Sequence, residues 1–176
     1  NHVVLPKDYI RYKMTDEYAM EVSDAAGTLL FDVQRRQWSH EMMDAIGLPK
    51  DVMPAVFESI DICGAITKSV AEVTGLKAGT PVVAGGADNT CGAVGTGIVR
   101  SGRVLASLGT SGVVFAHMDE VHVDPDLRVH SFCHSIPHKW YLMGVVLFAG
   151  GSLQWLRNTV GEIEVSAARM MDIDPY

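Results

Sequence analysis

Residues Val82-Val83-Ala84-Gly85-Gly86-Ala87-Asp88-Asn89 carry the pattern that decides the fold. The apolar run predicts a strand over 81–84 that is covered on both faces, and the two glycines let the backbone turn and a ligand approach closely. Small residues over 90–99 predict a helix after the turn. An acid at the end of such a strand lies where open α/β sheets bind ligands. Asp88 is therefore a candidate catalytic base, although an aspartate here also suits a helix N-cap.

Composition excludes some classes of function. The chain has 176 residues, 48% of them hydrophobic, which is enough for a sizeable core as one domain or as parts of two. A formal net charge of −7 argues against nucleic-acid binding, because phosphate contacts need clustered Lys and Arg. Cys63, Cys91 and Cys133 have apolar or small neighbours, which predicts reduced thiols in a cytoplasmic protein. Gly, Ser and Thr interrupt the uncharged stretches, so we expect no membrane span and no membrane partner.

The rest of the pattern indicates an α/β protein with two parts. Helices are predicted over 5–14, 39–46, 66–74 and 152–160, and strands over 104–108, 113–116 and 140–146. Residues 23–28 are typical of a loop. A hairpin, a further strand and a helix begin a new sheet instead of continuing the first. We therefore place a domain boundary near Val99, with residues 1–99 and 100–176 facing a cleft.

The turn Gly109-Thr110-Ser111-Gly112 is a second candidate site. A glycine-bracketed hairpin turn can direct several backbone N–H groups one way, and its hydroxyls add donors that suit phosphate oxygens. The same residue types also build ordinary hairpin turns, so both interpretations stay open. No Gly-Lys-Ser/Thr follows, which excludes a Walker loop. Gly150-Gly151 before a helix is a third possible anion contact and is weak on its own.

Two other chemistries receive little support. His130, Cys133 and His134 are spaced as zinc ligands could be, but the pattern offers no fourth ligand. We therefore expect a packed structural segment there and no metal site. Ser111 and Ser131 lie outside any Gly-x-Ser-x-Gly elbow, so serine-hydrolase chemistry is not indicated.

Several motifs taken together resemble bacterial members of the FGGY family of carbohydrate kinases that act on xylulose. In chain order the motifs cover residues 6–12, 23–28, 85–89, 107–112 and 130–134. The resemblance extends from about residue 5 to residue 160. It departs from the family pattern at Ala87, where a third glycine is usual, and at Thr90, where alanine is common.

The resemblance implies two actin-like, ribonuclease-H-like domains with sugar and ATP bound between them. Residues 1–99 would be the latter part of the first, sugar-binding domain, and residues 100–176 the opening of the second, nucleotide-binding domain. Asp88 would act as the base on the sugar hydroxyl, and Asn89 would contact the sugar. The remaining matched positions, which would hold ATP, are Gly109 and Thr110 at the phosphates and Gly150 and Gln154 at the nucleotide.

The implied reaction is phosphorylation of D-xylulose to D-xylulose 5-phosphate in pentose catabolism, with ATP and Mg²⁺. The family's first phosphate loop would precede Asn1 and its adenine site would follow Tyr176, so we expect this piece alone to be inactive. Its uncovered edges would associate with the remaining segments of the enzyme or form a homodimer. Glycerol, ribulose and gluconate stay alternative substrates. A non-catalytic sugar- or nucleotide-binding regulator and an actin-like assembly protein stay alternative functions.

Overall fold

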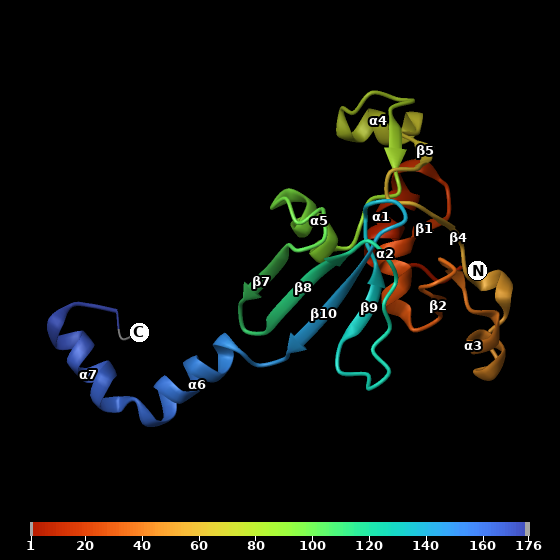
Figure 1. The fold of residues 1–176 in the computed structure, drawn as a ribbon. Coiled ribbons are helices and arrows are strands. Elements are labelled where there is room, and N and C mark those ends of the chain that lie inside the picture. Colours follow the sequence, from red (N-terminus) through yellow and green to blue (C-terminus); the bar gives the residue numbers. More distant parts are fainter. Residues whose placement is uncertain (1, 175–176) are drawn as a thin grey trace.

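The computed structural model describes residues 2–174. An N-terminal assembly of short helices and paired strands lies beside a four-stranded sheet, and two helices extend from the far side of that sheet (Figure 1). The first part contains α1 (Pro6–Thr15), β1 (Ala19–Glu21), α2 (Val22–Ala25), η1 (Ala26–Thr28), β2 (Phe31–Asp32), β3 (Gln37–Trp38), α3 (His40–Ala45), η2 (Lys50–Val52), β4 (Ala55–Phe57), β5 (Ile62–Ala65), α4 (Lys68–Thr74), β6 (Pro81–Val83) and α5 (Asp88–Gly95). The second contains β7 (Val104–Leu108), β8 (Gly112–Met118), β9 (His130–Cys133), β10 (Trp140–Val146), α6 (Gly150–Val160) and α7 (Glu162–Met171).

Local signals explain several helix boundaries in the first part. Helix α1 begins at Pro6, whose missing N–H costs nothing at that position, and ends at Asp16 in the left-handed conformation. The Ser39 side chain accepts the Met42 N–H and caps α3, as predicted. Helix α4 ends at Gly75, which also adopts the left-handed conformation. These three predicted helices are confirmed, with ends shifted by one or two residues.

Three local predictions were wrong. Residues 23–28 are helical because the Glu21 carboxylate caps α2, accepting the N–H groups of Ser23 and Asp24. Strand β6 is not covered on both faces: it forms a two-stranded antiparallel ladder with β5, and Val83 is 49% exposed. Helix α5 spans 88–95 instead of 90–99, so Asp88 is its first residue.

The four strands of the second part form one antiparallel sheet in the order β7-β8-β10-β9. Leu108 pairs with Gly112 across the predicted hairpin, and β10 lies antiparallel to both β8 and β9. The sheet is separate from the three strand pairs of the first part, as predicted. Strand β9 was not predicted. It forms the edge of the sheet beside β10, in register with residues 140–143.

Buried side chains join the two parts. One core cluster combines Met20, Val22 and Phe31 from the first part with Cys133 at the end of β9. A second combines Ala93 of α5 with Phe115 and Tyr141 of the sheet, whose rings stack 4.1 Å apart. Helix α5 therefore packs directly on the sheet.

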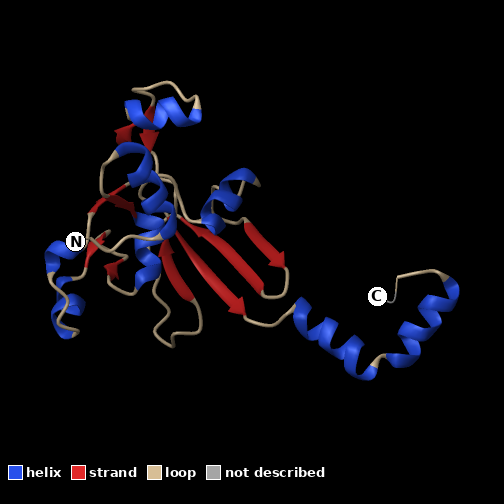
Figure 2. Cartoon of the chain, turned by 180° about the vertical axis from the view of Figure 1, so that it is seen from behind, coloured by secondary structure: helices blue, strands red, loops and turns tan. Residues whose placement is uncertain are grey.

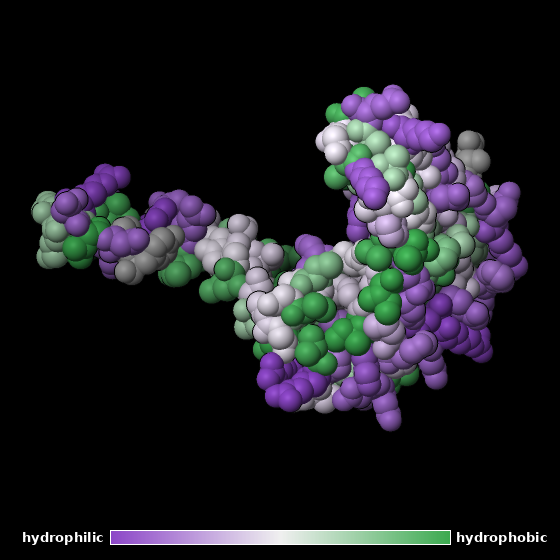
Figure 3. Space-filling model, turned by 90° about the horizontal axis from the view of Figure 1, so that it is seen from above, coloured by the Kyte–Doolittle hydropathy of each residue, from purple (hydrophilic) through white to green (hydrophobic). Residues whose placement is uncertain are grey.

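Helices α6 and α7 reach away from the body of the molecule, as the view from behind shows (Figure 2). Their apolar side chains include Trp155 and Ile163, which are 57% and 80% exposed. Seen from above, polar and apolar residues are mixed along this arm, and apolar residues gather on the body of the molecule (Figure 3). No helix within residues 2–174 combines the length and the hydropathy that crossing a bilayer requires.

Two buried histidines lie inside the sheet region. His117 of β8 and His134 after β9 are 2% and 0% exposed, and their rings lie 5.0 Å apart. The His134 Nδ1 accepts the Ile136 N–H at 3.1 Å. Burial, reinforced by the neighbouring His117, lowers the pKa of His134 to about 4. The folded protein thus holds His134 neutral at physiological pH.

This depressed pKa predicts acid-sensitive stability. In the unfolded chain His134 titrates near the ordinary histidine pKa of 6.5, so the unfolded state binds more protons between pH 6.5 and about 4. The free energy of unfolding should therefore fall as pH drops through that window. His134→Asn keeps an acceptor for the Ile136 N–H but cannot be protonated, so its stability should depend less on pH. Urea unfolding of the intact protein at pH 7 and pH 5 measures this, with exposed His130→Asn as the control. Identical pH dependence in both variants and the parent would contradict the assignment.

Candidate functional site

Asp88 lies at the turn between β6 and α5. Gly85 makes the turn with φ +85°, a backbone conformation that side chains disfavour. Ala87 is the N-cap of α5, so Asp88 does not occupy the capping position. Its side chain is exposed, and Oδ1 accepts the N–H of Asn89 at 2.7 Å. An exposed carboxylate fixed on the first turn of a helix can accept a proton from a bound hydroxyl.

Gly86 is required by packing inside the chain. A Cβ at this position would clash with the Ser135 hydroxyl, and it would lie 3.1 Å from the Cys91 Sγ and 3.2 Å from the Thr90 Oγ1. The expected close approach at this glycine is therefore made by the protein's own side chains. Its effect is to bring the start of α5 against the segment that follows β9.

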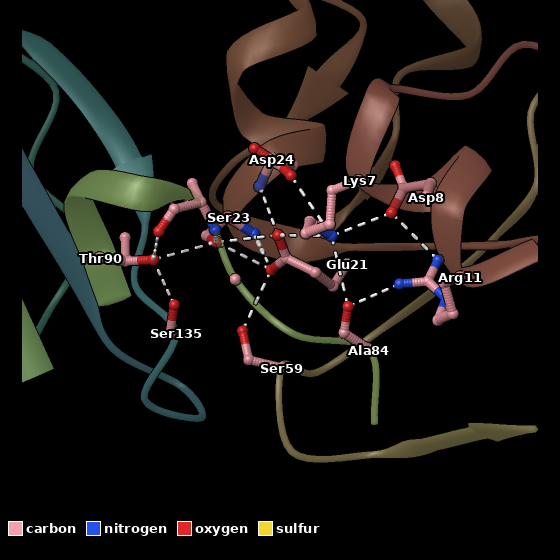
Figure 4. A network of polar contacts seen from close by, with 12 residues as sticks. Lys7, Asp8, Arg11, Glu21, Ser23, Asp24, Ser59, Ala84, Thr90 and Ser135 are labelled. Carbon is pink, nitrogen blue, oxygen red and sulfur yellow. Dashed lines mark hydrogen bonds and ion pairs between the residues drawn. The ribbon is translucent and has the colours of Figure 1, made fainter. Parts of the chain in front are cut away.

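A network of buried charges lies next to this turn (Figure 4). The Lys7 Nζ lies 2.9 Å from the Asp8 carboxylate, 3.3 Å from Asp24 and 3.6 Å from Glu21. Arg11 also binds Asp8 and donates to the carbonyl oxygen of Ala84, the residue before the glycine turn. The charged groups therefore fix the strand end from which the Asp88 segment departs.

Lys7 and Asp24 lie at the edge of this network. Their side chains are 30% and 21% exposed, whereas those of Asp8 and Glu21 are fully buried. Burial raises the pKa of the Asp24 carboxyl, and the adjacent Lys7 ammonium opposes that shift. This pair presents both signs of charge beside the glycine turn.

Sequence reasoning missed the charge network to which Lys7 and Glu21 belong. Single charged residues in a helix and a short strand resemble ordinary surface positions. The available signal was the order Glu21-Val22-Ser23-Asp24, in which an acid precedes two residues whose N–H groups it can cap.

The candidate nucleotide residues lie together at a second place. A pocket of about 310 Å³ is lined by Leu108, Gly109, Thr110, Gly150, Gly151, Leu153 and Gln154. Two segments that are forty residues apart in sequence therefore line one pocket. Asp88 and Asn89 are not among its lining residues and belong to a separate element.

Backbone contacts explain how the two segments meet. The N–H groups of Ala149 and Gly151 donate to the Thr110 carbonyl at 2.7 and 3.2 Å, and the Gly150 N–H donates to the Gly109 carbonyl at 3.0 Å. A Cβ on Gly150 would clash with that Gly109 oxygen. The start of α6 is thus fastened to the hairpin turn, and its first amides are already bonded.

The His130–His134 segment has a structural environment. The buried Cys133 Sγ contacts the Val33 carbonyl at 3.6 Å, and burial raises the pKa of this thiol to about 12. His130 is exposed on β9, whereas His134 is buried and uses Nδ1 as an acceptor. Within residues 2–174, no group of three or more His, Cys, Asp or Glu side chains is arranged to hold a metal ion.

The fold is part of a two-domain, actin-like sugar kinase architecture. A crystal structure of a xyloylose kinase from Brucella ovis superposes with a TM-score of 0.86 at 40% identity, covering 91% of this chain and 33% of that one. Residues 1–95 match the N-terminal domain of the FGGY family of carbohydrate kinases. The chain belongs to this family, which confirms the resemblance drawn from its motifs.

Curated relatives show the same similarity. Xylulose kinase of Escherichia coli (strain K12) is 48% identical over 165 residues, which cover 94% of this chain and 34% of the relative. Xylulose kinase of Bacillus subtilis (strain 168) is 47% identical over 156 residues, covering 89% and 31%. The chain spans about a third of the length of these relatives.

The junction between turn and helix gives a testable prediction. Gly150→Ala should force α6 away from Gly109, at a cost of ~1–3 kcal/mol for overpacking. Hydrogen exchange of the 149–151 amides in the intact protein should then become faster. Gly92→Ala is the matched control, because no atom lies within 4 Å of its added Cβ inside α5. Unchanged protection of the 149–151 amides in Gly150→Ala would contradict the prediction, because it would show that the junction accommodates a Cβ at this position.

Proposed function

We propose that the intact protein containing this chain transfers a phosphoryl group from ATP to D-xylulose, forming D-xylulose 5-phosphate. The observation that carries this proposal is the exposed Asp88 carboxylate on the first turn of α5, directly after the glycine turn. Its support is the 47–48% identity to two xylulose kinases. We assign residues 1–99 to the sugar side and residues 100–176 to the nucleotide side of the active site.

In this proposal Asp88 is the general base. Its Oδ1 already accepts the Asn89 N–H, so Oδ2 would take the proton of the sugar C5 hydroxyl. The C5 oxygen, as it loses its proton, attacks the γ-phosphorus of ATP. The bond between the γ-phosphorus and the β-phosphate oxygen breaks, and ADP leaves. The Asn89 side chain offers one donor and one acceptor group for orienting the sugar hydroxyls. Positioning and charge stabilisation supply most of the catalysis in such transfers.

The pocket around Gly109 is the proposed nucleotide contact. Since the first amides of α6 are bonded to the turn, the polar groups left to meet phosphate include the Thr110 hydroxyl and the Gln154 amide. Gly150 would contribute a surface without a side chain. Mg²⁺, bound with ATP, would neutralise phosphate charge.

The substrate assignment is tested by comparing sugars. The intact enzyme should release ADP with a higher kcat/KM for D-xylulose than for ribulose, gluconate or glycerol. A higher kcat/KM for another acceptor would contradict the assignment of D-xylulose and identify that acceptor as the substrate. Binding of sugar or ATP without sugar-dependent ADP release would favour the regulator instead.

Replacement of the base gives the second test. Asp88→Asn should lower kcat by about 10²–10⁴-fold, because general-base catalysis contributes on that order. The KM for D-xylulose should change much less, since the shape of the side chain is kept. Asp51→Asn, at an exposed position in η2, is the control. Near-normal turnover of Asp88→Asn with D-xylulose would remove Asp88 from the catalytic role.

Removal of one hydroxyl tests the phosphate contact. Thr110→Val should raise the KM for ATP roughly tenfold or more, because a hydrogen bond to a charged group contributes about 1.5–3 kcal/mol. The KM for the sugar should stay close to that of the parent. Ser111→Ala is the comparison, since Ser111 lies in the same turn but is not among the residues lining the pocket. Equal effects on both substrates, or on neither, would contradict the assignment.

A further inference from the structure

The backbone that leads into Asp88 is held by two hydroxyl groups. The Ser23 Oγ accepts the N–H of Ala87 at 2.9 Å, and the Thr90 Oγ1 donates to the carbonyl oxygen of Ala87 at 2.8 Å. The two hydroxyl oxygens lie 3.3 Å apart. The peptide groups on both sides of the Ala87 Cα are therefore fixed by side chains, and Asp88 is the next residue.

Ser23 comes from another part of the chain and has a fixed orientation. It is 3% exposed, and its Oγ lies 2.9 and 2.8 Å from the two carboxylate oxygens of the fully buried Glu21. An ionised carboxylate only accepts, so the Ser23 proton points to Glu21 and a lone pair is left for the Ala87 N–H. The bond to a charged acceptor is also stronger than one between neutral groups.

Ala87 needs this support because it cannot cap its own helix. An alanine at the N-cap has no side-chain acceptor, and none is formed in α5. Ser23, which belongs to α2, instead accepts the N–H of Ala87 at the start of α5. Figure 4 shows the resulting chain of contacts from Glu21 through Ser23 to the segment that carries Thr90.

We infer that Ser23, oriented by Glu21, is a positioning residue that sets the place of Asp88 through the Ala87 backbone. The inference rests on the proposed role of Asp88 as base. If the 86–87 peptide is free to rotate, Asp88 moves with it, and a misplacement of about 1 Å can cost on the order of 10²-fold in rate. Ser23 itself touches no reacting atom in this arrangement.

The test compares two serines that share one partner. Ser23→Ala removes the acceptor of the Ala87 N–H and should lower kcat roughly tenfold or more, with the KM for D-xylulose within about twofold. Ser59→Ala is the matched control: Ser59 is also buried and donates to the Glu21 carboxylate at 3.1 Å, but its hydroxyl makes no bond to Ala87. It should keep a kcat close to that of the parent, because Glu21 retains the Ser23 hydroxyl, the Ser23 and Asp24 N–H groups and the Lys7 ammonium. Equal kcat in the two variants would overturn the inference.

Two further measurements separate positioning from folding. Ser23→Cys keeps the shape of the side chain, but its sulfur is a poorer acceptor than the hydroxyl. Its kcat should lie below that of the parent, and this holds as a test even if Ser23→Ala is unstable.

In the Asp88→Asn background, Ser23→Ala should cause no additional loss of kcat, because the effects of residues that act as a unit are not additive. An additive loss would show that Ser23 acts elsewhere. Full activity of Asp88→Asn would instead remove the proposed base, a result distinct from failure at Ser23.

Discussion

The burial of the Glu21 carboxylate is the constraint on which the rest of the site depends. A buried charge is strongly unfavourable unless it is paired and hydrogen-bonded. Glu21 meets this requirement with the N–H groups of Ser23 and Asp24, the hydroxyls of Ser23 and Ser59, and the Lys7 ammonium. These partners come from α1, from the start of α2 and from the loop after β4. One carboxylate therefore joins three segments that are separate in sequence.

Sequence patterns predicted the local elements better than their surroundings. The 109–112 hairpin, the cap at Ser39 and the glycine stop of α4 follow from residues next to one another, and each was confirmed. The coverage of β6 was predicted wrongly because an apolar run does not reveal which elements pack on it. Helix α2 was missed because its cap is a buried glutamate, a residue type that usually indicates a surface position.

The candidate site shows the same division. Asp88 and the Gly109 turn could be proposed from sequence because glycines mark backbone turns beside chemically capable side chains. The meeting of Gly109 with Gly150 depends on a long-range backbone contact, which spacing alone does not specify. The motif resemblance assigned both glycines to ATP contacts without predicting that they touch. The structure shows the contact and its physical reason: the Gly150 N–H reaches the Gly109 carbonyl only because Gly150 carries no Cβ.

Helix α5 connects the two halves of this arrangement. Its first turn is held by Ser23 and Thr90, and Ala93 packs against Phe115 and Tyr141 of the sheet. Thr90 also contacts Ser135, in the connection between β9 and β10. The same sheet carries the Gly109 turn at the other end of β8. The position of Asp88 relative to that turn is therefore set by a packed helix and a hydrogen-bonded sheet. Such rigid support suits phosphoryl transfer, in which the protein's main contribution is to hold the attacking hydroxyl and the phosphate in line.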